Sequence, residues 1–214
     1  PSRSVSQWIA LRAPVSVELG FYALIVALII GLSAGIVASL RPNTLTDYIP
    51  MSIAMAGICM PTFVMGPLIV LIFALKLQWL PVSGWDSAAE KILPSITLGA
   101  VYAAYVARLA RGGMFEVLAQ DFIRTARAKG LSETRVVLRH ALRGGLQPVI
   151  SFLGPAAAGL LTGSFVVEKI FIIPGLGKQF VDAAFNRDYT LLMGAVLFYA
   201  ALILIFNLIV DVAQ

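Results

Sequence analysis

The chain has 214 residues, of which 59% are hydrophobic and 13% charged, and its formal net charge is +5. Its mean hydropathy of +0.91 excludes an ordinary water-soluble domain, because soluble proteins carry about 25% charged residues. Lipid is therefore the expected solvent for most of the chain. Cys59 is the single cysteine, which excludes an internal disulfide and a cysteine metal cluster.

Five stretches without Asp, Glu, Lys or Arg predict membrane-spanning helices. Four of them hold 22 residues or more, and at about 1.5 Å per residue such a helix crosses a hydrocarbon core about 30 Å thick. The third is shorter, and it gains the required length if the side chain of Arg108 extends to the headgroups. We expect the second span to kink, with Pro50 at or before its start. Within one domain, 1–214, the predicted spans are about 19–40, 50–75, 92–110, 146–167 and 189–211.

Small residues recur at helix-contact spacing in three of the spans. They are Gly31 and Gly35 in the first, Gly99, Ala103 and Ala107 in the third, and Gly159 and Gly163 in the fourth. This spacing lets helix backbones approach closely in lipid. No acid or base stands in the middle of a span, which weakens a proton-relay or ion-coupled mechanism. Glu168 lies at the outer end of a span and is expected to be a solvated end charge, with a place in an outer vestibule as the alternative.

The distribution of charge orients the spans. Residues 108–143 hold eight Lys or Arg and three acids, so this loop carries the whole net charge of +5. The positive-inside rule therefore predicts that the loop is cytoplasmic. Alternation of the spans then places residues 41–47 and the C-terminus inside, and it places outside the segments 1–18, 76–91 and 168–188.

The basic loop between the third and fourth spans, 111–145, has a helical pattern. Met114–Ala128 is predicted to form a helix, because its apolar residues recur at helical spacing. Lys129-Gly130 provides a basic last turn and a glycine stop. Ser132 can cap a second helix, Glu133–Leu142. The sequence therefore predicts a helix, a tight turn and a second helix beside the membrane.

The pattern leaves several interpretations of this loop open. A basic loop of this kind is suited to binding anionic lipid headgroups or to docking a soluble partner. Nucleic-acid binding is poorly supported, because no aromatic residues interleave the basic ones. His140 is the sole histidine, and it lacks the Cys or acid neighbours of a metal site.

The segment Gly175–Gln179 superficially resembles the end of a phosphate-binding loop. Ile172 stands where that motif needs its first glycine, and Gln179 stands where it needs Ser or Thr; both departures remove groups that cradle phosphate and magnesium. We therefore interpret this segment as a turn. A membrane enzyme is a weaker second class, because the sequence shows no nucleophile elbow or metalloprotease motif.

A family resemblance rests on the basic loop. Residues 122–131, followed by 139–142, resemble the conserved cytoplasmic loop of binding-protein-dependent ABC importer permeases, and more narrowly of their oligopeptide and dipeptide branch. In the general family this loop begins Glu-Ala-Ala. Here residues 124–126 read Arg-Thr-Ala, and Gly130 keeps the spacing of the family glycine. The general Ile-x-Leu-Pro ending is absent at 140–143, and these departures resemble the variant of the peptide branch.

The resemblance covers essentially the whole chain and is nearest to the B-type subunits of oligopeptide permeases. It implies an all-α integral membrane fold, the type I ABC importer transmembrane domain, in a bacterial inner membrane. It implies five spans here, a sixth span upstream of residue 1, and a cytoplasmic helix–turn–helix coupling loop. The other matching segments are Arg12–Gly20, Leu80–Trp85, Gly163–Glu168, Ile173–Gly177, Asn186–Tyr189 and Asn207–Asp211.

The resemblance further implies a non-catalytic permease subunit that forms half of the pathway of an ATP-driven peptide importer. The implied partners are a second homologous permease, two ATPase subunits that bind ATP and Mg, an extracytoplasmic substrate-binding protein and membrane lipid, without nucleic acid. No cofactor is implied for this chain. Glutathione or nickel chelates are alternative cargoes within the family, and an ion-coupled secondary transporter is the less favoured class.

The same resemblance assigns contact with the ATPase to one short segment of the loop. We expect Ala126, Ala128 and Leu131 to be small or apolar enough to enter a groove of that subunit. Gly130 is expected to adopt a left-handed backbone conformation in the turn. No residue is assigned to the substrate pathway. The assigned contact residues are Arg124, Thr125, Ala126, Arg127, Ala128, Lys129, Gly130, Leu131 and Ser132.

Overall fold

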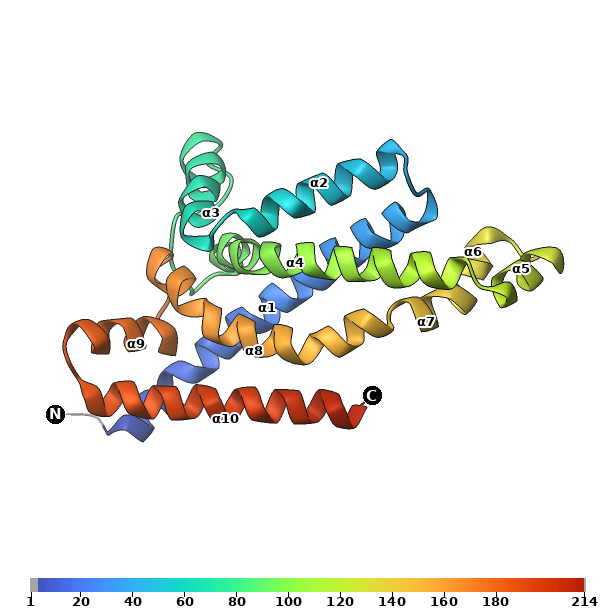
Figure 1. The fold of residues 1–214 in the computed structure, drawn as a ribbon. Coiled ribbons are helices and arrows are strands. Elements are labelled where there is room, and N and C mark those ends of the chain that lie inside the picture. Colours follow the sequence, from blue (N-terminus) through green and yellow to red (C-terminus); the bar gives the residue numbers. More distant parts are fainter. Residues whose placement is uncertain (1–3, 214) are drawn as a thin grey trace.

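The computed structural model describes residues 4–213, and the side chains of all of these except 162, 163 and 213. The described residues form helices joined by loops, without a strand (Figure 1), so the all-α prediction is confirmed. The sixth span expected upstream lies outside the described residues. The helices are α1 Val5–Leu40, α2 Leu45–Cys59, α3 Thr62–Ile69, η1 Val70–Lys76, α4 Ala88–Leu118, α5 Asp121–Ala128, α6 Glu133–Arg135, η2 Val136–Ala141, α7 Leu142–Gly145, α8 Gln147–Ile170, α9 Leu176–Phe185 and α10 Tyr189–Ala213, with η1 and η2 π-helical.

Among the described residues, three helices are long and apolar enough to cross a membrane, namely α1, α4 and α10. Two bent helix pairs raise this number to five if each pair is one span. α1 is longer than the first predicted span, because its 36 residues include the outer segment expected before residue 19. Ser4 starts this helix through a capping box with Gln7, in which each side chain satisfies a free backbone N–H of the other residue.

The second predicted span is broken rather than kinked. α2 ends at Cys59 and α3 begins at Thr62, and the two segments are bent by 111°. Pro61 occupies the N-cap of α3, where the missing backbone N–H of proline is tolerated. Pro50 lies inside α2 instead of at or before its start. The 15 residues of α2 cover about 22 Å, which is too short to cross the hydrocarbon core alone.

The most extensive helix packing in the bundle is between α1 and α4. A Cβ atom added to Gly31 would lie 2.6 Å from the carbonyl oxygen of Ala103, and one added to Gly99 would lie 2.5 Å from that of Ala23. Gly35 approaches the carbonyl of Ala107 in the same way. The expected small-residue packing is confirmed, because these contacts leave no room for a side chain.

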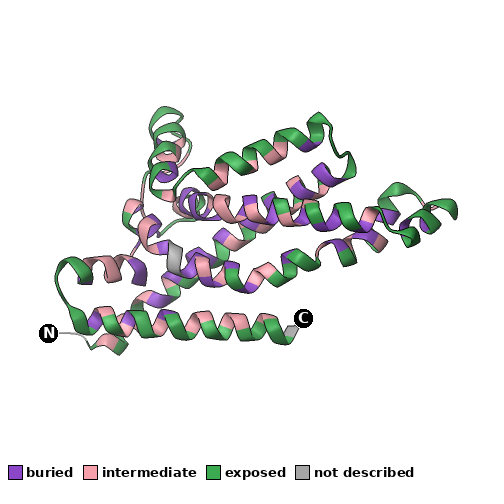
Figure 2. Ribbon diagram, viewed as in Figure 1, coloured by how far each residue is buried: buried purple, intermediate pink, exposed green. Residues whose placement is uncertain are grey.

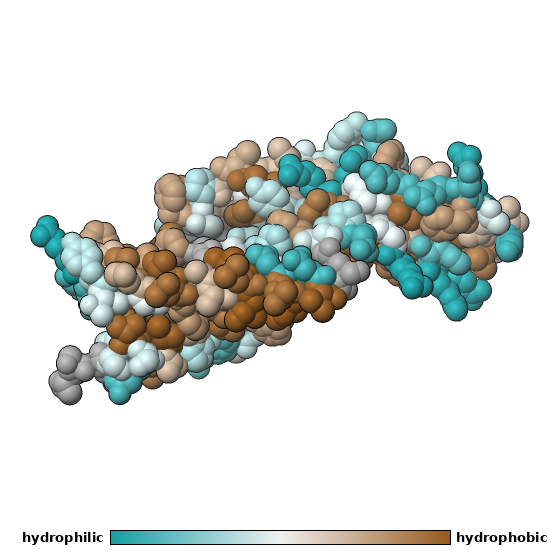
Figure 3. Space-filling model, turned by 60° about the horizontal axis from the view of Figure 1, so that its bottom comes forward, coloured by the Kyte–Doolittle hydropathy of each residue, from teal (hydrophilic) through white to brown (hydrophobic). Residues whose placement is uncertain are grey.

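Much of the apolar surface faces outward. Leu197 and Leu204 of α10 are 69% and 70% exposed, and Asp47 is the one described residue of α2 that is buried. Exposed residues follow both helices in Figure 2. Apolar side chains cover much of the middle of the molecule in Figure 3, whereas polar ones gather at the end that holds α5 and α6. Apolar surface of this extent requires lipid or another membrane chain to cover it.

Candidate functional site

The candidate coupling segment, residues 124–132, lies where α4 extends beyond the bundle (Figure 1). The prediction of one helix over Met114–Ala128 is wrong, because α4 ends at Leu118 and α5 begins at Asp121. Gln120 is the N-cap of α5 and has an extended backbone. Asp121 adds a carboxylate at the positive end of that helix, which favours a new start there. The break lets α5 pack on η2 and share a buried cluster with the end of α4 instead of prolonging α4.

The turn after α5 is a Schellman motif. The N–H of Gly130 donates to the carbonyl of Arg127 at 2.9 Å, and the N–H of Leu131 donates to that of Ala126 at 3.4 Å. These bonds satisfy carbonyls that a helix end leaves free. Gly130 has φ of +77°, a conformation that costs little for glycine and about 1 kcal/mol or more for other residues. The expected left-handed glycine is confirmed.

The inner side of α5 is fixed to the ends of two other helices. Ile123 is 0% exposed and Ala126 is 6% exposed, and Leu131 packs partly buried against them. Ala126 therefore faces the chain's own core rather than a groove of a partner, whereas the contact of the partly buried Leu131 with a partner stays a prediction. We call this core the inner cluster, and it consists of Met114, Val117, Ile123, Ala126, Val136, Val137 and Ala141.

Apart from the exposed Phe122, the outer side of α5 is polar and mostly basic. Ala128 is its exposed small residue. Arg127 donates from Nη2 to Glu133 Oε1 at 2.6 Å, and this hydrogen bond holds the pKa of Glu133 below its ordinary value. Arg124 lies 3.5 Å from Asp121. A partner would therefore meet a rigid, partly neutralised basic surface, whose exposed members are Arg124, Thr125, Arg127, Ala128, Lys129, Gly130 and Ser132.

The second predicted helix of the loop is present in an altered form. Helical turns run from Glu133 to Gly145, with a π-helical segment at Val136–Ala141. Ser132 occupies the N-cap position without a side-chain capping bond. The helical segment then leads into α8 with a bend of 52°. A Cβ atom on Gly113 would collide with the carbonyl of Gly145, so α4 and α7 are in backbone contact beside the inner cluster.

A buried ion pair that the sequence analysis missed lies between α2 and α4. Asp47 is 1% exposed, and its two carboxylate oxygens accept from Nε and Nη2 of Arg111 at 2.5 and 2.7 Å. The backbone N–H of Asn43 donates to the same carboxylate at 3.0 Å. Such bidentate pairs fix geometry as well as charge. The pair therefore attaches the first turn of α2 to the basic end of α4.

Glu168 was expected to be solvated, and this prediction is wrong. Its side chain is 0% exposed and accepts hydrogen bonds from the hydroxyls of Ser16 at 2.7 Å and Ser164 at 2.9 Å. The backbone N–H of Lys178 donates to its other oxygen at 2.8 Å. The segment Gly175–Gln179 is correspondingly the start of α9 rather than a turn. A carboxylate at a helix N-terminus is stabilised by the free N–H groups there.

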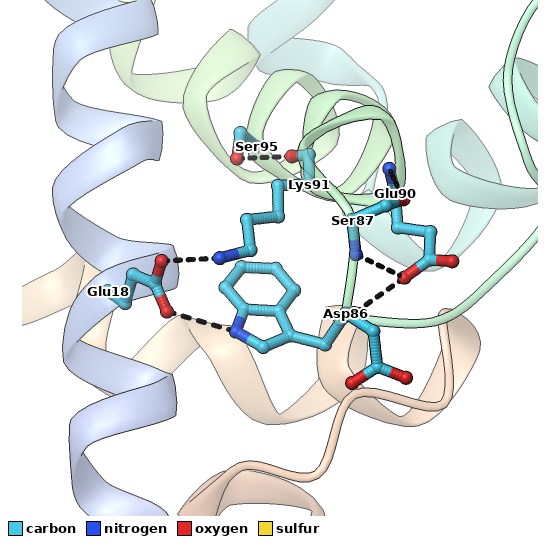
Figure 4. Close-up of polar contacts among 7 residues, drawn as sticks. Glu18, Asp86, Ser87, Glu90, Lys91 and Ser95 are labelled. Carbon is cyan, nitrogen blue, oxygen red and sulfur yellow. Dashed lines mark hydrogen bonds and ion pairs between the residues drawn. The ribbon is translucent and has the colours of Figure 1, made fainter.

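A second polar network joins the loop before α4 to α1 (Figure 4). Lys91 Nζ lies 2.6 Å from Glu18 Oε1, and Trp85 Nε1 donates to Glu18 Oε2 at 3.1 Å. The Lys91 ammonium also lies 5.2 Å from the centroid of the Trp85 ring, which is within cation–π range. Glu90 closes the start of α4 through a capping box with Ser87. The end of the molecule opposite to α5 is therefore held by polar contacts.

The fold and the candidate site together define a class of protein. A bundle of apolar helices carries a polar, mostly basic module at one end, which is the arrangement of an integral membrane protein. Residues 23–214 match the family described as "Binding-protein-dependent transport system inner membrane component". The chain belongs to this family of inner-membrane transport components.

Named relatives extend the match to nearly the whole chain. The oligopeptide transport system permease protein OppB of Haemophilus influenzae is 49% identical over 212 residues, covering 98% of this chain and 69% of the relative. OppB of Escherichia coli K12 is 50% identical over 211 residues, with the same coverage of both chains. The dipeptide transport system permease protein DppB of Bacillus subtilis is 46% identical, over 100% of this chain and 69% of the relative.

Solved structures confirm the fold. A chain of the inward-facing MetNI methionine ABC transporter has a TM-score of 0.78 at 15% identity, and the match covers 100% of both chains. A chain of an amino acid ABC transporter solved with histidines has a TM-score of 0.74 at 16% identity, over 97% of this chain and 92% of that chain. The architecture is therefore that of the type I ABC importer transmembrane domain.

Proposed function

We propose that this chain forms half of the translocation pathway of an ATP-driven importer of oligopeptides or dipeptides. Relatives named for oligopeptide and dipeptide transport are 46% to 50% identical to it, which supports peptides over glutathione, nickel chelates or ion-coupled transport. The observation that carries the coupling role is the attachment of α5 to α4 and η2 through the inner cluster.

In this proposal, residues 124–132 dock an ATPase subunit on the cytoplasmic side, and ATP and Mg bind in that separate chain. Closure of the ATPase pair displaces α5. Ile123 shares one buried cluster with Met114 of α4 and Val136 of η2, so the displacement of α5 is passed to both helices through this cluster. Movement of packed, rigid elements against one another is a common route from a nucleotide site to alternating access.

The proposed assembly also contains a second, homologous permease and an extracytoplasmic substrate-binding protein. The exposed apolar side chains of α2 and α10 support the need for another membrane chain, together with lipid. A bundle with up to five spans in its described part is small for enclosing a peptide-sized channel alone. The pathway is therefore placed between two such subunits.

Reconstitution tests the proposed function. The chain is co-purified with its companion permease and ATPase subunits and placed in liposomes, with the binding protein and a radiolabelled oligopeptide on the side that corresponds to the cell exterior. ATP on the opposite side is expected to drive uptake of the peptide. Uptake without ATP, or by this subunit as a homodimer without ATPase subunits, would contradict the proposal.

The orientation of the loop is tested by cysteine labelling. Cys59 is first replaced by Ser, and Ser132→Cys and Asn186→Cys are then made separately, since both native residues are exposed. A membrane-impermeant maleimide is expected to label position 186 in intact cells and position 132 only after permeabilisation, because the basic loop faces the cytoplasm. Labelling of position 132 in intact cells would reverse the proposed topology.

A further inference from the structure

A groove of about 290 Å³ lies between α2 and α4. Met51, Met55 and Ile58 line its α2 side, and Ala104, Arg108 and Arg111 line its α4 side. Because Asp47 is the one buried residue in the described length of α2, this helix is fixed at its first turn and packs loosely beyond it. The groove can therefore widen without disruption of a packed core.

The two arginines of the groove differ in their charge balance. Arg111 is neutralised by Asp47 through two short hydrogen bonds. Arg108 is exposed, and the described residues supply it with no ion pair. The groove therefore presents one uncompensated guanidinium, which is a bidentate donor suited to a carboxylate.

The side chain of Arg108 contacts an aromatic ring of its own helix. Its guanidinium lies 5.5 Å from the centroid of the Tyr105 ring, one turn nearer to the start of α4. Arg108 follows Ile92 by 16 residues, or about 24 Å of helix, which lies within a core about 30 Å thick if α4 enters it near Ile92. Arginines inside a span face a water-filled cavity, a partner charge or, near the end of the span, the headgroups.

We propose that the groove between α2 and α4 is a peptide-binding part of the pathway, in which Arg108 pairs with the C-terminal carboxylate of the transported peptide. Met51 and Met55 contact the peptide side chains, since flexible methionines adapt to varied apolar shapes. Tyr105, which packs on Phe152 of α8 at 5.8 Å, positions the guanidinium. This inference rests on the proposed function in peptide import.

An anionic lipid headgroup would present a similar charge to Arg108. The loose packing of α2 favours a transient, variable occupant. The test below separates the two sources of charge.

Photo-crosslinking in the complete, reconstituted complex tests occupancy of the groove. A photoreactive benzoylphenylalanine replaces Met55, and in a control it replaces Leu197, which is 69% exposed on α10. A radiolabelled oligopeptide delivered by the binding protein is expected to label position 55 during turnover and to leave position 197 unlabelled. Equal labelling of both positions, or of neither in a complex that imports the peptide, would overturn the groove assignment.

Substitution of Arg108 tests its charge. Arg108→Ala is expected to reduce peptide uptake by about tenfold, as loss of one charge-assisted contact predicts, and Arg108→Lys to retain part of it. Arg41→Ala removes an exposed cation outside the groove and is expected to leave uptake unchanged.

The defect of Arg108→Ala should persist in liposomes of pure phosphatidylcholine. Normal uptake by Arg108→Ala, or wild-type uptake that falls to the variant's level without anionic lipid, would refute the peptide contact. Failure of wild type to import peptide in any liposome would instead refute the proposed function.

Discussion

Replacement of Gly130 by Asp is expected to abolish coupled transport in a permease that still inserts and assembles with its companion permease. The variant places an anion beside Arg127 and Lys129, on the exposed surface proposed to meet the ATPase. It also adds strain at φ of +77°, which costs about 1 kcal/mol. A Cβ atom at this position meets nothing within 4 Å, so the chain's own core is unaffected. Peptide uptake and peptide-stimulated ATP hydrolysis in proteoliposomes provide the measurement.

Two further variants at the same position separate charge from strain. Gly130→Asn has nearly the shape of Asp without its charge, and asparagine tolerates a left-handed backbone, so most transport should remain. Gly130→Ala adds strain alone and should lower transport modestly. Normal uptake and normal stimulated hydrolysis in Gly130→Asp would remove the docking assignment and leave a lipid-binding loop. Equal loss in Gly130→Asn would show that the anion is not the cause.

The sequence predicted the turn after α5 well, because its determinants are local. A basic last turn followed by Gly130 specifies a helix stop whichever partners surround it. The helix before it was predicted too long, because the apolar pattern continued through Leu118 to Ile123. In the structure Phe122 is 46% exposed while Ile123 is buried, so the pattern combined a core residue with a surface one. The break between α4 and α5 depends on packing against Val136 and Val137. These residues lie more than ten positions further along the chain, so the local apolar pattern could not predict the contact.

The polar contacts between distant helices could not be predicted from local patterns. Asp47 and Arg111 are 64 residues apart, and in the sequence each looks like an ordinary charge at the end of a span. Glu168 likewise followed an apolar run, where a solvated carboxylate is the usual outcome. Two signals were available in retrospect. Ser164 precedes Glu168 by one helical turn, and the glycines of the 174–177 segment mark a close approach of the backbone.

Glu168→Ala is expected to lower the melting temperature of the purified complex by more than about 5 °C, as a loss on the order of 3 kcal/mol would do in a domain of this size. The substitution leaves a cavity and removes the acceptor for Ser16, Ser164 and the N–H of Lys178. Trypsin cleavage after Lys178 should accelerate, because the start of α9 is released. Glu116→Ala, at an exposed carboxylate of α4, is the matched control and should change neither measurement.

A double-mutant cycle with Gly175 tests whether the carboxylate itself holds the start of α9. A Cβ atom on Gly175 would collide with Glu168 Oε2 and would lie 2.7 Å from Ser16 Oγ. The backbone there, with φ of −89° and ψ of 176°, is open to alanine, so the cost of Gly175→Ala comes from the collision alone. We expect Gly175→Ala to destabilise the wild-type protein strongly. In the Glu168→Ala background the same substitution should destabilise much less, because the new methyl group can occupy the space that the carboxylate leaves. Strictly additive losses of melting temperature would instead indicate that the two residues act independently, and the carboxylate would not be the contact that requires glycine at the start of α9.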